Sequence, residues 1–188
     1  MIATALFLLI SFFTPGQTPA GVCLNNDEKT LFEAVNAYRE TLDLEPVKFS
    51  QALTQVAQAH VRDLAENYDF KPNARCNPHG WSKKGEWSSC CYTADHKQAE
   101  CMWNKPREIA NFDTNGFEIL SYSSDGVTPT EALLGWQKSK GHHEVMINKG
   151  MWEKVTWGSM GVGIHEEWAV VWFAVLDDPI QESPEDCK

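Results

Sequence analysis

Two segments near the N-terminal side of the chain, 27–42 and 50–67, carry apolar residues every three or four positions. This spacing predicts two amphipathic helices, each with one face toward a protein core. Asn26 or Asp27 is the expected N-cap of the first helix, and Ser50 is the expected N-cap of the second. Both helices should therefore begin at defined residues and pack against the same domain.

A third helix is predicted from its start signal. Thr128 and Glu131 form a Thr-x-x-Glu capping box, and Pro129 occupies the first helical position. Gly141 is expected to end this helix in the left-handed region. His142 would then leave the helix end at a fixed place, either as a functional group or as a cap on the last carbonyls beside the imidazole at position 143.

The β pattern lies in the C-terminal third and in one segment before the third helix. Residues 160–164 and 168–176 flank three residues, 165–167, and predict an antiparallel hairpin. The second strand is apolar on both faces, so helices should cover the sheet on both sides. A short strand is also expected over Phe117–Tyr122, with Glu118 pointing away from its apolar neighbours, either to solvent or into a polar site.

The first twenty residues contain no charged side chain, and residues 2–13 are almost entirely apolar. This run is too short to span a bilayer, which takes about 20 apolar residues. We interpret residues 1–20 as a signal peptide with cleavage after Ala20, and a membrane-held N-terminal helix is the alternative. Residues 21–188 would then form one domain, exported to the extracellular space or to the periplasm if the source is bacterial.

The charge balance excludes one class of partner. The chain has 26 acidic and 16 basic residues, a formal net charge of −10. A nucleic-acid backbone would be repelled, and a strongly anionic membrane surface is disfavoured for the same reason.

Six cysteines in an exported chain predict disulfides. If the first and last join the termini, and the adjacent 90 and 91 do not pair with each other, two arrangements remain for the central four: 76 with 90 and 91 with 101, or 76 with 91 and 90 with 101. A four-thiolate zinc site is the competing interpretation. These central cysteines lie in 70–112, a stretch without sustained periodicity that should be loop-rich. The cysteines are Cys23, Cys76, Cys90, Cys91, Cys101 and Cys187.

The order of these parts resembles a known family. After the first predicted helix come Leu-Glu-Pro-Val-Lys-Phe-Ser at 44–50 and a second helix that contains Ala-Gln-Ala-His at 57–60. Then follow His79, Glu118, Trp136, Gly141-His142 and the sequence Gly-Val-Gly-Ile at 161–164. This order is similar to the CAP superfamily, or SCP domain, of cysteine-rich secretory, antigen 5 and pathogenesis-related proteins, and is closer to its short bacterial branch. The resemblance implies a three-layer α-β-α sandwich with an antiparallel central sheet, and a cavity of histidines and acids that holds a divalent metal.

The resemblance assigns candidate metal ligands position by position. His79, Glu118 and His142 match the family's two cavity histidines and one of its acids. Ser139 stands where the family often has the second acid, so Glu131 on the same helix is the remaining candidate, although its capping box already explains it. His60, by contrast, falls on the apolar face of its helix, where we expect a packed, hydrogen-bonded core histidine.

Two imidazoles and a carboxylate suit zinc and leave a position for water. No His-Glu-x-x-His motif is present, and disulfides would consume the thiols, so protease chemistry lacks support. We therefore expect a secreted binding module rather than an enzyme, with a cavity for a divalent metal or a small ligand, a lipid included. The alternatives are a metal-assisted extracellular hydrolase and a disulfide-linked surface for a protein partner around a vestigial cavity. Trp81, Trp87 and Trp103 would line an apolar groove or simply be buried.

Overall fold

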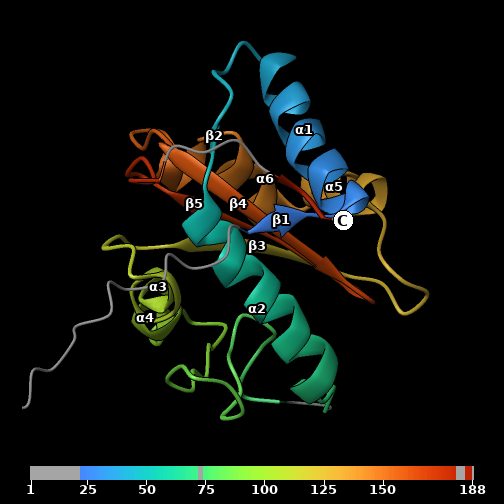
Figure 1. Cartoon of the computed structure of the whole chain (residues 1–188), viewed down its shortest axis with the longest axis vertical. Coiled ribbons are helices and arrows are strands. Elements are labelled where there is room, and N and C mark those ends of the chain that lie inside the picture. The colour runs from blue at the N-terminus through green and yellow to red at the C-terminus, as the bar shows by residue number, and fades with distance from the viewer. Residues whose placement is uncertain (1–21, 72–73, 181–184, 188) are drawn as a thin grey trace, which may run out of the picture.

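The computed structural model describes residues 22–71, 74–180 and 185–187, so the predicted signal peptide lies outside the described residues. A four-stranded sheet in the order β2-β4-β5-β3 forms the centre of the molecule (Figure 1). The neighbours β3, β5 and β4 are antiparallel, and β2 adds a two-residue parallel pairing at the edge beside β4. The strands are β2 (Lys48–Phe49), β3 (Phe117–Tyr122), β4 (Ser159–His165) and β5 (Trp168–Ala174).

Helices cover both faces of this sheet (Figure 1). One face packs against α1 (Asn26–Glu40), α5 (Pro129–Lys138) and α6 (Lys140–Met146), and the other against α2 (Gln51–Asn67) with the short α3 (Ala99–Trp103) and α4 (Lys105–Ala110). A 3₁₀ turn, η1 (Gly150–Trp152), follows α6. Along β5 the buried side chains alternate between the two cores, which explains why its sequence is apolar on both faces. The three-layer sandwich expected from the sequence is confirmed.

The helix caps explain where the helices begin. Ser50 accepts a hydrogen bond from the backbone N–H of Leu53, as predicted for the cap of α2. The cap of α1 is Asn25, one residue before the predicted positions, because Asn25 and Glu28 form a reciprocal capping box. The Asn-x-x-Glu spacing of residues 25 and 28 is the local signal for this cap. The predicted capping box at the start of α5 is present.

The hairpin of β4 and β5 is tighter than predicted. His165 pairs with Trp168, so the connection has two residues instead of three. Glu166 adopts a left-handed backbone conformation with φ 51°. Glycine or asparagine usually takes that conformation, and the acidic sequence therefore gave no signal for the shorter turn.

The close contact between α2 and β4 depends on a glycine. A Cβ atom on Gly161 would lie 2.2 Å from backbone atoms of Leu53 and Thr54. A side chain here would therefore push the helix backbone away from the sheet.

We expect Gly161→Ala to lower the free energy of unfolding by about 1–3 kcal/mol, the usual cost of overpacking a core. The matched control is Gly135→Ala in α5, where the nearest atom, Ser121 Oγ, is 4.0 Å from the added Cβ. That change should stabilise the protein by up to about 1 kcal/mol through helix propensity. Urea denaturation of both variants measures the difference, and equal effects would contradict the packing argument.

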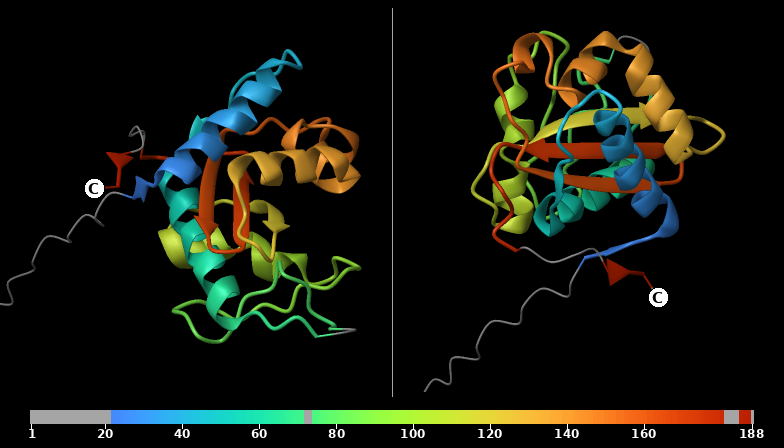
Figure 2. Two further views of the ribbon diagram at one scale, coloured as in Figure 1. Left: turned by 90° about the vertical axis from the view of Figure 1, so that its right-hand side faces the viewer. Right: turned by 90° about the horizontal axis from the view of Figure 1, so that it is seen from above.

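Three disulfides hold the periphery of the fold. Cys23 pairs with Cys187, Cys76 with Cys91 and Cys90 with Cys101, so the second of the two predicted arrangements is present. The first bridge lies beside a small parallel pair, β1 (Cys23–Leu24) and β6 (Glu185–Asp186), at one side of the molecule (Figure 2). Each bridge should contribute about 2–4 kcal/mol to stability by restricting the unfolded chain.

The cysteine-rich stretch 70–112 is largely loop, as predicted, except for the two short helices α3 and α4. Helices of five and six residues are too short to produce a readable period. Among the described residues, no helix is both long and apolar enough to cross a bilayer.

Candidate functional site

Strand β3 places Glu118 at the edge of the sheet, on the face that α2 covers. Glu118 lies opposite Trp172 in the antiparallel ladder, and it is 7% exposed. The alternation predicted for this strand is present, because the neighbouring Ile119 packs in the core on the other face. Of the two environments considered for Glu118, the buried polar site is the one observed.

His79 approaches Glu118 from a tight turn. The backbone N–H of Gly80 donates to the carbonyl oxygen of Asn77, and the Asn77 side chain accepts from the His79 N–H. The sequence of this turn, Asn-Pro-His-Gly, has the residue types that favour turns. The His79 Nδ1 atom lies 2.7 Å from Glu118 Oε1, and His79 therefore donates to the carboxylate.

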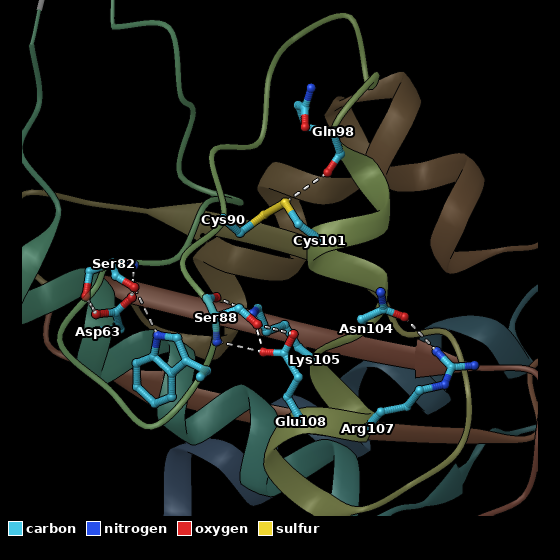
Figure 3. Close-up of polar contacts among 11 residues, drawn as sticks. Asp63, Ser82, Ser88, Cys90, Gln98, Cys101, Asn104, Lys105, Arg107 and Glu108 are labelled. Carbon is cyan, nitrogen blue, oxygen red and sulfur yellow. Dashed lines mark hydrogen bonds and ion pairs between the residues drawn. A yellow bond between two sulfur atoms is a disulfide. The ribbon is translucent and has the colours of Figure 1, made fainter.

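The disulfide-linked loop fixes this turn in place. Asn77 donates its backbone N–H to Tyr92, and Trp81 and Cys90 exchange two backbone hydrogen bonds. The bridges to Cys76 and Cys101 begin at the adjacent pair Cys90 and Cys91, and Figure 3 shows the one between the loop and α3. The disulfide from Cys76 to Cys91 and the pairing of Trp81 with Cys90 therefore hold the chain on both sides of the His79 turn.

His60 lies under the cluster and has no exposed surface. Its Nδ1 hydrogen-bonds to Glu118 Oε2, and its Nε2 donates to the carbonyl oxygen of Gly80 at 3.0 Å. Both partners are oxygen atoms, so both ring nitrogens of His60 are engaged, one with Glu118 and one with the His79 turn. The ring stacks on the indole of Trp81 with 4.1 Å between centroids. His60 thus fixes both β3 and the residue that follows His79.

His142 follows the break between α5 and α6, and the position of this break differs from the prediction that Gly141 ends the helix. Ser139, not Gly141, ends α5, because it adopts an extended conformation that turns the chain into a second short helix. Gly141 lies inside α6 without a left-handed conformation. His142 therefore projects from the first turn of α6 instead of leaving the end of α5.

The His142 ring lies 6.3 Å from the His79 ring, measured between centroids. Burial lowers the pKa of His142, the nearby His79 lowers it further, and Glu118 acts in the opposite direction. His142 is therefore held neutral, with a lone pair on one ring nitrogen. Its ring makes no hydrogen bond to any described residue, whereas the ring of the adjacent His143 is fixed to α1 by Tyr38 Oη at 2.9 Å from its Nε2.

The charge on Glu118 is determined by opposing effects. Burial raises the pKa of this carboxyl group, but His60 and His79 outweigh burial and lower the pKa to about 2. Glu118 is therefore a carboxylate at neutral pH. It accepts from one imidazole at each oxygen.

Comparison with known proteins agrees with this architecture. The model of the cysteine-rich secretory protein family, CAP, matches residues 32–175, which is most of the chain. The chain belongs to the CAP family. No curated protein sequence matches the chain significantly.

Solved structures share the fold of this CAP domain at low sequence identity. An extracellular protein containing an SCP domain from Bacillus anthracis matches with a TM-score of 0.54 and 18% identity, over 79% of this chain and 40% of that one. A cysteine-rich secretory protein from Staphylococcus aureus gives 0.52 and 14%, over 80% and 38%. An outer surface protein from Borrelia burgdorferi gives 0.54 and 17%, over 82% and 98%. This CAP domain thus spans less than half the length of the first two proteins.

The structure brings the three predicted ligands of this CAP domain, His79, Glu118 and His142, into one cluster, but not into a three-ligand geometry. Among the described residues, no three His, Cys, Asp or Glu side chains converge as a metal site. Both oxygens of Glu118 accept hydrogen bonds from imidazoles, one from His60 and one from His79. A divalent cation in this cluster would therefore be bound by ring nitrogens of His79 and His142, without a carboxylate oxygen.

The fourth predicted member does not join this cluster. Glu131 is exposed, and its carboxylate accepts hydrogen bonds from the backbone and hydroxyl of Thr128. In the described part of the chain it has no contact with Glu118 or either histidine. Ser139, at the family position for the second acid, provides no carboxylate.

His60 and Tyr92 also contact the cluster, and neither contact was predicted from the sequence. The apolar periodicity of α2 predicted the burial of His60, but it carried no information about Glu118 on a distant strand. Tyr92 lies with its ring 5.3 Å from the ring of His79, and its hydroxyl is 2.8 Å from His96 Nδ1. Only its position next to Cys91 hinted that it would lie beside the His79 turn.

The three tryptophans pack in the core on the α2 face. Trp81 is buried, and Trp87 and Trp103 are half-buried against the same cluster. The structure therefore shows burial for Trp81 and partial burial for the other two.

Proposed function

We propose that this chain is an extracellular CAP-domain binding protein that holds a divalent cation between His79 and His142. Export is supported by three disulfides, by the apolar N-terminal sequence, and by the descriptions of two structural neighbours as extracellular and outer surface proteins. The proposal assigns no reaction to the site.

The observation that carries the proposal is the hydrogen bond from His79 Nδ1 to Glu118. Because Nδ1 is engaged with Glu118, Nε2 is the ring nitrogen left to bind a metal, through its lone pair in the neutral form of the ring. A carboxylate behind a histidine is the usual arrangement that orients a metal-binding imidazole and raises its basicity. Glu118 therefore acts as the group that orients His79, and His142 supplies the second neutral nitrogen.

Imidazole nitrogens suit zinc, which commonly takes four ligands. Two ligands from the protein leave the remaining positions to water or to a polar group of a bound partner. The site should therefore bind zinc less tightly than a closed four-ligand site, and zinc bound there would polarise an oxygen ligand.

Elemental analysis of the purified mature protein, with zinc titration by calorimetry, tests the proposal. We expect one zinc ion per chain, removable by a chelator. Failure to bind zinc or another divalent cation would contradict the proposal and favour a protein-interaction module. Turnover of a peptide or ester that is lost with the chelator and restored by zinc would instead establish the hydrolase alternative.

A further inference from the structure

A separate cavity of about 630 Å³ lies between the end of α2 and the cysteine-rich loops. This volume is in the range of pockets that hold small organic ligands. The His79 turn separates the cavity from the histidine cluster, because Asn77 and Gly80 line the cavity while the His79 side chain points to Glu118. None of the candidate metal ligands lines the cavity.

The lining of this cavity carries a small excess of positive charge, two lysines against one aspartate, in a chain with a net charge of −10. Both lysines, Lys71 and Lys83, are exposed. Lys71 pairs with the exposed Asp69 at 2.9 Å, and Lys83 has no acidic partner among the described residues. These ammonium groups favour an anion on their side of the cavity.

The one acidic residue among the described lining residues is held by hydrogen bonds. Asp63 accepts from the backbone N–H of Ser82 at 2.7 Å and from the Ser82 hydroxyl (Figure 3). It also accepts from Asn67 at 3.0 Å. Both carboxylate oxygens thus already have donor partners in the protein, and Asp63 fixes Ser82 and Asn67.

The rest of the lining provides an apolar surface with a few polar groups. Leu64, Tyr68, Trp81 and the bridged Cys76 and Cys91 supply the apolar part. Asn67, Asn77 and Ser89 supply amide and hydroxyl groups. A ligand that matches this lining has an apolar body and one negatively charged end. We propose that this cavity binds an amphiphilic organic anion, with its charged group at Lys71 and Lys83 and its apolar body against Tyr68 and the disulfide.

A pair of fluorescent probes tests both parts of this proposal on the folded mature protein. The probes are 1-anilinonaphthalene-8-sulfonate, which is anionic, and N-phenyl-1-naphthylamine, which has the same apolar body without the charge. The double variant Lys71→Gln/Lys83→Gln should weaken binding of the sulfonate by about tenfold, since each surface charge contributes modestly to affinity. Binding of the neutral probe should be unchanged. The matched control is Lys138→Gln/Lys149→Gln, two exposed lysines outside the lining, which should change neither affinity.

A second variant locates the probes. Ser89→Trp should fill the cavity and weaken binding of both probes, whereas Met151→Ser, at an exposed apolar side chain outside the lining, should weaken neither. Thermal unfolding of each variant establishes that it is folded. Absence of sulfonate binding by the wild type, equal loss in both lysine pairs, or loss in Met151→Ser but not in Ser89→Trp would overturn the proposal. Zinc binding is measured separately, so either site can fail without the other.

Discussion

Alanine at both His79 and His142 is expected to abolish zinc binding in calorimetry while the protein still unfolds cooperatively. The two imidazoles are the only free nitrogen ligands of the cluster in the described part of the chain. Loss of a group that merely orients a metal ligand costs about 10- to 100-fold in affinity, so loss of a ligand itself should cost about 100-fold or more. Each single variant should therefore already lower zinc affinity by about 100-fold or more.

His143→Ala is the matched control for this pair. His143 is adjacent to His142 but is hydrogen-bonded to Tyr38, away from His79. The change should cost about 1 kcal/mol of stability, the value of one hydrogen bond, and leave zinc affinity within about twofold. Equal loss of zinc in His142→Ala and His143→Ala would contradict the assignment of His142.

Glu118→Gln should have the largest effect on stability, a loss of about 3 kcal/mol in urea denaturation at pH 7. The buried carboxylate accepts from His60 and His79, and removal of one partner of a buried ion pair typically costs about 3–5 kcal/mol. A glutamine must also direct its NH₂ group at one imidazole. If it donates to His79 Nδ1, the hydrogen of that ring moves to Nε2, and zinc binding is lost.

Acid unfolding provides an independent measure of the same group. The folded-state pKa of Glu118 is about 2, below its ordinary value of 4.5, because the imidazoles outweigh burial. A group with a lowered folded pKa contributes stability above its unfolded pKa and loses it as the pH falls toward the folded pKa. The wild type should therefore lose stability more steeply than Glu118→Gln between about pH 4.5 and pH 2.

The same substitution at Glu131 is the control for both experiments. Glu131 is exposed and caps α5, so its loss should cost at most about 1 kcal/mol. Zinc binding should be unchanged, because Glu131 has no contact with the cluster. Loss of zinc in Glu131→Gln would instead make this residue the missing acid.

Local signals in the sequence predicted most of the fold. The 3.6-residue period gave α1 and α2, the Thr128 and Glu131 capping box gave α5, and the apolar strand 168–176 required helices on both faces. Each of these features depends on residues close together in the chain. Their agreement with the structure follows from that locality.

The errors occurred where residues distant in sequence decide the outcome. Gly141 carried the stronger helix-stop signal, yet the chain turns at Ser139, where an extended serine starts a second helix packed on β3. The pairing of the four central cysteines was likewise open, because both arrangements satisfy the sequence. Three-dimensional packing resolved each case.

The candidate site was only partly predictable for the same reason. The family resemblance identified the positions of His79, Glu118 and His142, but not their mutual roles. His60 on α2 occupies one oxygen of Glu118, and on this ground we propose that the carboxylate orients His79 instead of binding the metal. No local pattern could have predicted a contact between residues 58 positions apart.

The most direct test of the proposed zinc site is ¹⁵N nuclear magnetic resonance of the histidine rings, without and with zinc. We expect the metal-free His79 to carry its hydrogen on Nδ1, and zinc to shift His79 Nε2 and one nitrogen of His142 while the His60 resonances stay in place. A hydrogen on Nε2 of metal-free His79, or zinc that shifts neither ring, would contradict the proposed site.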